Sequence, residues 1–433
     1  MLTKLRIKNF KCLKDTGDLE IRPLTFLVGP NSSGKSSLLQ MLLMLRQTLD
    51  STDFNNPLAP KNGLVNLGSY PEFIYKNDIN QELEVKLEFT NYPKRNKNIF
   101  LNSIFYYNPT TTQIELKESK INYNNEYISN IVRHQKEEKE YSGIFSITKK
   151  GKEKEKKWDI KNIRPIKFHN YFIHADKGKG QKDIDEKIPP EILFRRASFL
   201  IEMELRHYLF YLGPLRIFPS RFYGPSGQEP QDVGVRGERA IDVLWFLNRS
   251  KEKKEKEANL LVQKWVKKFG FADKMELNRI GESNIYRVLI TDPAMKIEVN
   301  FTDIGFGATQ IIPVIIESFY ARDDSLILIE QPEIHLHPKA QSILGDLFIS
   351  AFKNGKNRFI IETHSEHLLS RVRRRIAEGK IKKEDVVIYY FKNTFDGTTI
   401  QEVRLNEKGQ YYKFPKGFFE ESYNEAVNHL KAL

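Results

Sequence analysis

The most constraining feature of this chain is the stretch from Leu24 to Leu49, in which a glycine-rich loop joins two apolar runs. Residues 24–28 predict a buried strand, and the Leu and Met spacing after Lys35 is typical of a helix. The loop follows the pattern G-x-x-x-x-G-K-S, with Gly29, Pro30, Asn31, Ser32, Ser33, Gly34, Lys35 and Ser36 as its members. The sequence therefore predicts a strand, a loop and a helix, in that order.

This pattern has a direct chemical interpretation. Glycines adopt backbone conformations closed to other residues, so the loop amides can turn inward around phosphate groups. The following helix points the positive end of its dipole at the same phosphates. We expect Lys35 to bind the β- and γ-phosphates of ATP, and Ser36 to hold Mg²⁺, with Ser37 beside it. An ordinary glycine-serine turn is the alternative, and the flanking strand and helix argue against it.

Length and composition limit the class of protein. A chain of 433 residues can form two or three domains, or one large domain with insertions. Its single cysteine, Cys12, excludes an intramolecular disulfide and a zinc cluster built from cysteines. The chain opens without a signal peptide and has no run of about 18 apolar residues, so we expect a cytoplasmic protein with no membrane partner.

The chain is strongly basic, with a net charge of +13 and a pI near 9.3. This charge favours an acidic partner, with nucleic acid as the first candidate. Much of the excess lies in residues 133–168, where Lys and Glu alternate, and in Arg371, Arg373, Arg374 and Arg375. The first segment is more typical of a solvated insertion than of a DNA contact. For the four arginines, a DNA contact and partners within the chain both remain open.

Alternating apolar and polar residues predict strands at 5–10 and 19–21, which we expect to pair beside the phosphate-loop strand. Further strands are predicted at 83–89 and 100–107, in an antiparallel β portion. Residues 120–185 are rich in Asn, Lys and Glu, and we expect an insertion there without a sustained heptad repeat. An amphipathic helix is predicted over 189–212. It leads into a Gly- and Pro-rich segment whose arginines, Arg216 and Arg221 among them, suit either phosphate binding or pairing with the chain's own carboxylates.

The second half of the chain contains another glycine-rich turn that precedes a helix, as the phosphate loop does. The turn from Asp303 through Gly305 and Gly307 to Thr309 opens an apolar helix, whose first amides are available to an anion. Residues 325–329 form a continuous apolar run, as in a central parallel strand. Glu330 follows this run directly, which predicts it at the same sheet edge as the phosphate loop. Residues 358–362 predict another buried strand, closely followed by His364.

These motifs together resemble the ABC-type ATPases of the SMC, RecF and OLD kind, beginning with "I-K-N-F-K" at residues 7–11. The resemblance implies that Asn9, Phe10 and Lys11 approach the base and ribose of the nucleotide. It also implies that the turn at 303–310 is a signature motif, which binds the γ-phosphate held by a partner subunit. The usual serine-glycine-glycine order of that motif is missing here.

The resemblance also gives roles to the residues around Glu330, which would support Mg²⁺. Gln331 stands where the family usually has a catalytic Glu, and an amide cannot accept a proton from water. We therefore expect slow turnover, or Glu333 as a substitute. His364 would be the switch histidine that senses the γ-phosphate. His335 and His337 admit a metal interpretation, but their position matches the loop that crosses the dimer interface in this family.

The wording Y-x-G-P-x-R, I-E-Q-P-E-I-H-L-H-P and G-F-F resembles an uncharacterised prokaryotic family of AAA ATPases allied to OLD, without a Toprim domain. We expect an α/β fold of the ABC-type ATPase head: a mostly parallel sheet, a flanking antiparallel β portion and a helical, charged insertion. The predicted domains are an N-terminal lobe (1–118), an insertion and helical region (119–270) and a C-terminal lobe (271–433). The 69 residues after His364 contain no D-x-D motif, so we expect no Toprim nuclease within this sequence.

The resemblance implies an ATP-hydrolysing switch in phage defence or DNA repair. Its expected partners are a second copy bound through an ATP sandwich, or a higher oligomer, with a nuclease subunit and double-stranded DNA as candidates. A slow ATP sensor or scaffold that controls a protein effector is the alternative, favoured by Gln331. The ATPase subunit of a transporter is a third possibility, and the missing standard signature argues against it.

Overall fold

The computed structural model describes residues 1–53, 56–90, 98–124, 127–133, 141–147, 156–173, 190–224 and 227–413, with residues 425, 427–429 and 431 near the C-terminus. Its contacts divide the chain into two compact units. The first contains Met1–Ile21, Pro30–Leu209 and Lys392–Ile400, and the second contains Arg22–Gly29, Phe210–Phe391 and Gln401–Leu433. The predicted three-part division stays a prediction. The tail motif Phe414–Phe419 lies outside the described residues.

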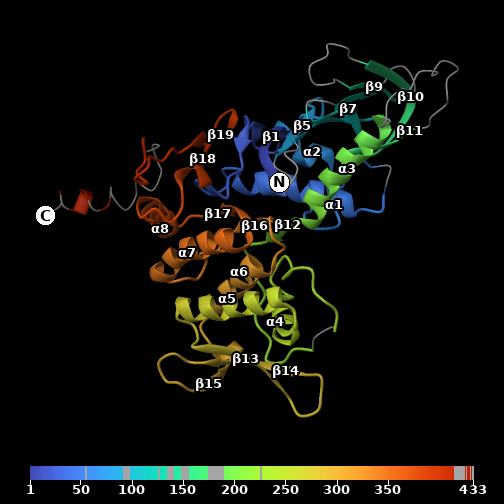
Figure 1. Cartoon of the computed structure of the whole chain (residues 1–433). Helices are drawn as coiled ribbons and strands as arrows, with labels where there is room; N and C mark the ends of the chain where they lie inside the picture. Colours follow the sequence, from blue (N-terminus) through green and yellow to red (C-terminus); the bar gives the residue numbers. More distant parts are fainter. Residues whose placement is uncertain are drawn as a thin grey trace. The chain divides into compact units, whose positions relative to one another are not determined.

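The first unit is built on an antiparallel sheet in the order β11-β10-β9-β8-β7-β6-β5-β1-β2, with β3 also paired to β1 (Figure 1). Its strands are β1 Leu2–Phe10, β2 Leu13–Asp15, β3 Leu19–Glu20, β5 Leu83–Phe89, β6 Ile99–Asn108, β7 Gln113–Tyr123, β8 Tyr127–Arg133, β9 Tyr141–Ile147, β10 Lys156–Lys167 and β11 Asn170–Ile173. Alternate residues of β5 are buried, because one face of the strand packs on the core. The predicted antiparallel β portion is therefore confirmed. The expectation that the strands at 5–10 and 19–21 pair beside the phosphate-loop strand was wrong, because β1 pairs with β2, β3 and β5, whereas the phosphate-loop strand, residues 24–28, lies in the other sheet.

The predicted insertion is more ordered than its sequence indicated. The described residues between 119 and 173 belong mostly to β7–β11, which continue the same sheet as antiparallel neighbours. Pairing with a neighbouring strand satisfies backbone groups whatever the side chains are, so a weak apolar pattern does not prevent a strand. The first helix after these strands is α3 Pro190–His207.

Two further helices complete the first unit: α1 Lys35–Asp50 and α2 Tyr70–Phe73, with a 3-10 turn at Tyr75–Asn77. The Leu and Met side chains of α1 are buried, as their spacing predicted. Lys167 at the end of β10 donates to the carbonyls of Leu49 (2.7 Å) and Ser51 (3.0 Å), at the negative end of α1. The sheet and the helix that follows the phosphate loop are thereby tied together.

The second unit is organised by a sheet in the order β12-β16-β17-β4-β18-β19, in which one end of each of β12, β18 and β19 belongs to the first unit. Its strands are β4 Leu24–Val28, β12 Leu209–Leu212, β16 Leu326–Glu330, β17 Arg358–Glu362, β18 Val386–Thr394 and β19 Gly397–Glu402. Strands β16, β17, β4 and β18 are parallel. Every residue of β4, β16 and β17 is buried, because helices cover both faces of a parallel sheet.

The helices of the second unit pack around this sheet and a smaller one (Figure 1). They are α4 Ala240–Arg249, α5 Lys253–Phe269, α6 Phe306–Tyr320, α7 Pro338–Gly355 and α8 Glu366–Ala377, with 3-10 turns at Phe301–Asp303 and Lys383–Asp385. The smaller sheet is antiparallel, with strands β13 Lys274–Arg279, β14 Tyr286–Thr291 and β15 Glu298–Asn300. The α/β class predicted from the sequence is confirmed.

Candidate functional site

The phosphate loop follows β4 directly and has the backbone conformation that its glycines predicted. Gly29, Ser32 and Gly34 have φ angles of 143°, 59° and 93°. A side chain at Gly29 would overlap the carbonyl oxygen of Phe391, and a Cβ at Gly34 would lie 2.6 Å from Cys12 Sγ. Both positions therefore require glycine. The strand, loop and helix predicted from residues 24–49 are confirmed.

Neighbours in the first unit brace the end of the loop. Thr398 Oγ1 donates to the carbonyl of Ser33 at 2.9 Å. The Lys35 ammonium is buried and donates to the carbonyl of Pro30 at 2.8 Å, so the lysine folds back across the loop. The buried Ser33 hydroxyl has no hydrogen-bond partner among the described residues. A glycine-rich loop with a buried lysine and a spare hydroxyl fits a phosphate chain.

The residues predicted to approach the base and ribose have structural partners. Phe10 is fully buried, and Asn9 Nδ2 donates to the carbonyl of Glu82 at 2.8 Å. Lys11 Nζ donates to Gln40 Oε1 on α1 at 2.6 Å, and its φ of 53° is left-handed. Phe10 is a core residue of the first unit. The nucleotide contacts of Asn9 and Lys11 stay a prediction.

Parallel pairing brings the second set of motif residues to one sheet edge. The register pairs Glu330, at the end of β16, with Glu362, at the end of β17, and Glu362 with Leu27 in β4. The phosphate loop leaves this edge after Val28. Glu330 therefore ends its strand on the edge from which the loop departs, as the sequence predicted. The Ser36 hydroxyl and the Glu330 carboxylate are oxygen donors of the kind that Mg²⁺ prefers.

Glu330 sits in a buried polar network. Tyr211 Oη on β12 donates to Glu330 Oε1 at 2.7 Å. Arg216, only 4% exposed, donates to the carbonyl oxygens of Glu330 (3.0 Å) and Gln331 (3.4 Å). The Gln331 amide donates to the carbonyl of Glu362 at 2.8 Å, with a left-handed φ of 44°. The backbone therefore turns sharply just after β16.

Burial dominates the electrostatics of this network. Burial and the neighbouring carboxylate of Glu362 raise the pKa of Glu330 to about 7, against the opposing effects of Tyr211 and Arg216. Burial also raises the pKa of Glu333. The pKa of Arg216 falls to about 10, because burial disfavours its charge more than the nearby glutamates favour it. A cation bound at Glu330 would replace the missing solvation of the carboxylate.

Glu333 and His364 are brought together. Glu333 Oε1 accepts a hydrogen bond from the backbone N–H of His364 at 2.6 Å. His364 follows β17 and precedes α8, whose first turn is capped by Ser365. Glu333 therefore fixes the backbone at the predicted switch histidine, a contact that the sequence analysis did not foresee.

The signature-like turn precedes α6 in the second unit. Gly305 is the N-cap of α6, and a Cβ at Gly307 would lie 2.5 Å from the carbonyl of His335. The buried Thr309 hydroxyl donates to the carbonyl of Phe306 at 2.8 Å, so it already makes a hydrogen bond within α6. Asp303 forms an exposed ion pair with Arg221 at 2.6 Å. The exposed amides at Gly305 are thus the part of the turn best suited to an anion.

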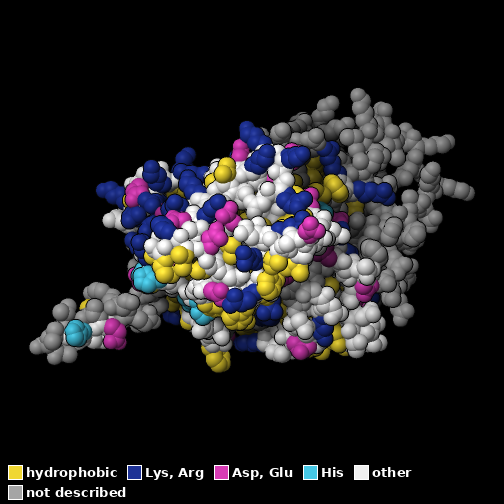
Figure 2. Space-filling view, turned by 90° about the horizontal axis from the view of Figure 1, so that it is seen from below, with side chains coloured by type: hydrophobic (Ala, Val, Ile, Leu, Met, Phe, Trp, Pro, Cys, Tyr) yellow, Lys and Arg dark blue, Asp and Glu magenta, His cyan; other side chains and the backbone are white. Residues whose placement is uncertain are grey.

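The arginines that could have been phosphate or DNA ligands have partners within the chain. Besides Arg216 and Arg221, Arg239 pairs with Asp232. On α8, Arg371 and Arg375 bind Asp346 of α7, Arg374 pairs with Glu378, and Arg373 donates to the carbonyl of Gly409. These contacts favour the structural interpretation left open by the sequence. On the face shown in Figure 2, lysine and arginine side chains are interspersed with acidic ones.

The two histidines of the predicted pair have contacts within the chain. His337 Nδ1 accepts from the amide of Lys339 at the start of α7, and His335 packs edge-on against Phe306. Within the described ranges, no group of three or more His, Cys, Asp or Glu side chains is arranged to hold a metal ion. No helix in those ranges combines the length and the apolar run that crossing a bilayer requires.

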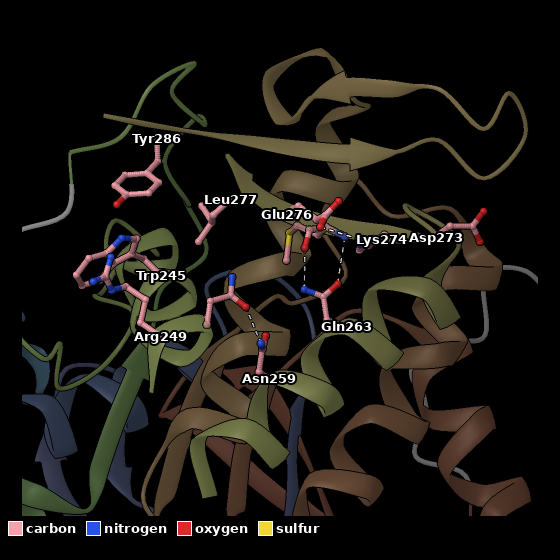
Figure 3. A pocket seen from close by; sticks show the side chains of 11 residues that line it. Trp245, Arg249, Asn259, Gln263, Asp273, Lys274, Glu276, Leu277 and Tyr286 are labelled. Carbon is pink, nitrogen blue, oxygen red and sulfur yellow. Dashed lines mark hydrogen bonds and ion pairs between the residues drawn. The ribbon is translucent and has the colours of Figure 1, made fainter. Parts of the chain in front are cut away.

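The structure also contains a pocket of about 570 Å³ between α4, α5 and β13 (Figure 3). Arg249 lies over the Trp245 ring at 4.9 Å, and the Tyr286 ring approaches that ring edge-on. The Gln263 amide exchanges two hydrogen bonds with the backbone of Met275. None of the motif residues lines this pocket, and the sequence analysis missed it because its residues share no spacing.

Comparison with known proteins identifies the family. A family model described as an AAA ATPase domain matches residues 1–369, so the chain belongs to this family of ATPases. A second model, described as a protein of unknown function (DUF3696), matches residues 381–428. The ATPase class that the sequence predicted is thereby confirmed.

One curated relative and several solved structures are similar to parts or all of the chain. The OLD nuclease of Thermus scotoductus is 50% identical over 42 residues, which are 10% of this chain and 8% of that protein. The SMC head domain from Thermotoga maritima has a TM-score of 0.43 at 11% identity, covering 93% of this chain and 99% of that chain. An Smc head domain bound to the C-terminal domain of ScpA, derived from Pyrococcus furiosus, has a TM-score of 0.41 at 11% identity, covering 99% of each chain.

Proposed function

We propose that this ATPase binds and slowly hydrolyses Mg-ATP, and that ATP joins two copies into a dimer that switches a DNA-directed process. The observation that carries the proposal is the shared sheet edge, where the phosphate loop leaves β4 and the buried carboxylate of Glu330 ends β16. Ligands in sheets of this kind bind at the carboxyl ends of the strands.

Each motif has a role in the proposed reaction. The loop amides, Lys35 and Ser36 bind the phosphates, and Glu330 supplies the carboxylate for the cation. Mg²⁺, when bound, neutralises charge that develops on the transferred phosphoryl group. Gln331 orients water without accepting its proton, which supports slow turnover. Glu333 fixes the backbone of His364, and His364 transmits the presence of the γ-phosphate to α8.

Exposed apolar side chains beside the signature-like turn support the dimer. Phe218 is 75% exposed and packs against Phe306, the first residue of α6, with ring centroids 5.0 Å apart. Leu215 nearby in sequence is 74% exposed. Exposed apolar residues grouped in this way are typical of interaction surfaces. We propose that this face meets the phosphate loop of the second copy.

DNA and a separate nuclease subunit are the proposed partners, in phage defence or repair. The net charge of +13 supports an acidic partner, and the local match to an OLD nuclease supports an association with nuclease activity. Gln331 favours a second candidate function, a slow ATP sensor that controls a protein effector without touching DNA.

A substitution at Gly305 is the clearest test of the dimer, and its readout is self-association. A Cβ at Gly305 has open space, whereas one at Gly307 would clash within its own chain. We expect ATP to dimerise the wild type in light scattering, and Gly305→Glu to stay monomeric while it still binds ATP. A Gly305→Glu protein that dimerises like the wild type would contradict the sandwich.

DNA dependence separates the two candidate functions. Turnover stimulated by double-stranded DNA, with a stimulation that fades as salt increases, would support the DNA-directed switch. Turnover that is indifferent to DNA at low salt would instead favour the sensor.

A further inference from the structure

The conspicuous Y-x-G-P-x-R segment, Tyr211–Arg216, has a task that the sequence left unassigned. Tyr211 belongs to β12, the edge strand next to β16 in the sheet order (Figure 1). Its hydroxyl reaches the Glu330 carboxylate at 2.7 Å across 119 residues of sequence. A hydrogen bond to a buried carboxylate fixes the direction in which the carboxylate points.

Arg216 holds the backbone on the other side of the same residue. Its guanidinium donates to the carbonyls of Glu330 and Gln331, two consecutive peptides at a left-handed turn. A turn of this kind in a non-glycine residue costs energy and persists only where its surroundings enforce it. Because Arg216 is buried and its terminal nitrogens bind these carbonyls, it is not a free ligand for phosphate or DNA.

The rest of the segment keeps these two side chains in place. The amide of Gly213 donates to the carbonyl of Val235 at 2.8 Å, and that of Ile217 donates to the carbonyl of Arg236 at 3.0 Å. A Cβ at Gly213 would lie 3.2 Å from Tyr211 Oη, so glycine leaves room for the tyrosine. Gly213, Tyr211 and Arg216 therefore act together to hold the side chain and the backbone of Glu330.

We infer that Tyr211 and Arg216 are positioning residues for Glu330, which orient its carboxylate and the following turn so that the site takes Mg²⁺ together with ATP. The inference rests on the proposed function, because it assumes that Glu330 serves the cation. Partners that orient a metal ligand typically change metal affinity by about 10- to 100-fold when they are removed. We therefore expect the loss of the Tyr211 hydroxyl to raise the Mg²⁺ requirement about tenfold.

The test measures binding of a fluorescent ATP analogue while Mg²⁺ is titrated, and again in EDTA without Mg²⁺. Tyr211→Phe removes one hydroxyl with little change of volume. Tyr223→Phe is the matched control, because its hydroxyl is also partly buried in the same stretch but accepts from the amide of Ser220. Arg216→Lys keeps one donor and Arg216→Met removes all of them, while thermal unfolding reports whether each variant folds.

The inference predicts that Tyr211→Phe shifts the Mg²⁺ midpoint about tenfold upward, leaves binding in EDTA unchanged, and differs from Tyr223→Phe. Arg216→Met should shift the midpoint further than Arg216→Lys. If Arg216→Met does not fold, the comparison of Tyr211→Phe with Tyr223→Phe alone tests the inference. An unchanged midpoint in Tyr211→Phe would overturn the inference, and so would equal losses with and without Mg²⁺, which indicate a purely structural role. A wild type that binds no nucleotide would instead refute the proposed function.

Discussion

Replacing Asp346 by asparagine is expected to destabilise the second unit by about 3 kcal/mol. The Asp346 side chain is 7% exposed and joins three helices: it binds Arg371 (2.7 Å) and Arg375 (2.5 Å) of α8, and Lys268 (3.7 Å) of α5. Breaking a buried ion pair costs about 3–5 kcal/mol, whereas an exposed pair contributes about 0–1 kcal/mol. The two guanidinium groups are about one-fifth exposed, which places the estimate near the lower end of the buried range.

The assay is urea unfolding followed by tryptophan fluorescence, to which Trp265 contributes from beside Lys268. Asp323→Asn is the matched control, since Asp323 is 62% exposed and its pair with Lys254 should contribute less than about 1 kcal/mol. A loss in Asp346→Asn no larger than in the control would refute the reasoning, and would mean that Asp346 does not hold Arg371 and Arg375 in place.

The same substitution predicts a pH dependence. Burial opposes ionisation of Asp346, but the hydrogen bond from Arg375 and the nearby cations outweigh it and hold its pKa below the ordinary value. A lowered folded-state pKa stabilises the protein above the unfolded pKa, which is about 3.9. The difference between wild type and Asp346→Asn should therefore be full near pH 7 and shrink as the pH falls below about 4. A difference that grows in acid would contradict this assignment.

Three further substitutions test the site. Gly34→Ala should lower ATP affinity at least tenfold in calorimetry, because Gly34 has a φ of 93° and a Cβ there would crowd Cys12 Sγ. Gly281→Ala is the control and should keep the affinity, since Gly281 has a φ of 56° but lies in open space. Equal affinities of the two variants would contradict the role of the loop. Gln331→Glu should raise single-turnover hydrolysis at least tenfold by supplying a base, and an unchanged rate would show that Gln331 does not limit turnover. Phe218→Ser should weaken ATP-dependent dimerisation in light scattering without changing ATP affinity, and unaltered dimerisation would remove this face from the proposed interface.

Local patterns were sufficient to predict the elements that carry the motifs. The phosphate loop, the buried run at residues 325–329 and the strand at 358–362 each have a signal within about ten residues, and each forms the predicted element. Parallel-sheet geometry then brought Glu330 to the edge where the loop leaves β4, because the carboxyl ends of parallel strands coincide.

Contacts set by strand order could not be predicted in the same way. Tyr211 meets Glu330 only because β12 is added beside β16, and no local pattern specifies that neighbour. The strands β8–β11 escaped prediction because paired backbones, rather than an apolar pattern, define them. Arg216 was a candidate ligand for phosphate or DNA, but in the structure it binds two buried backbone carbonyls instead. These carbonyls belong to residues more than 100 positions away in the sequence.

ATP binding and turnover of the purified wild type, beside Lys35→Ala, test the central claim most directly. The account predicts that the wild type binds ATP and releases phosphate slowly in the presence of Mg²⁺. Lys35→Ala should lose nucleotide binding while it keeps the thermal stability of the wild type. A Lys35→Ala protein that binds and hydrolyses ATP like the wild type would contradict the assignment of the phosphate loop.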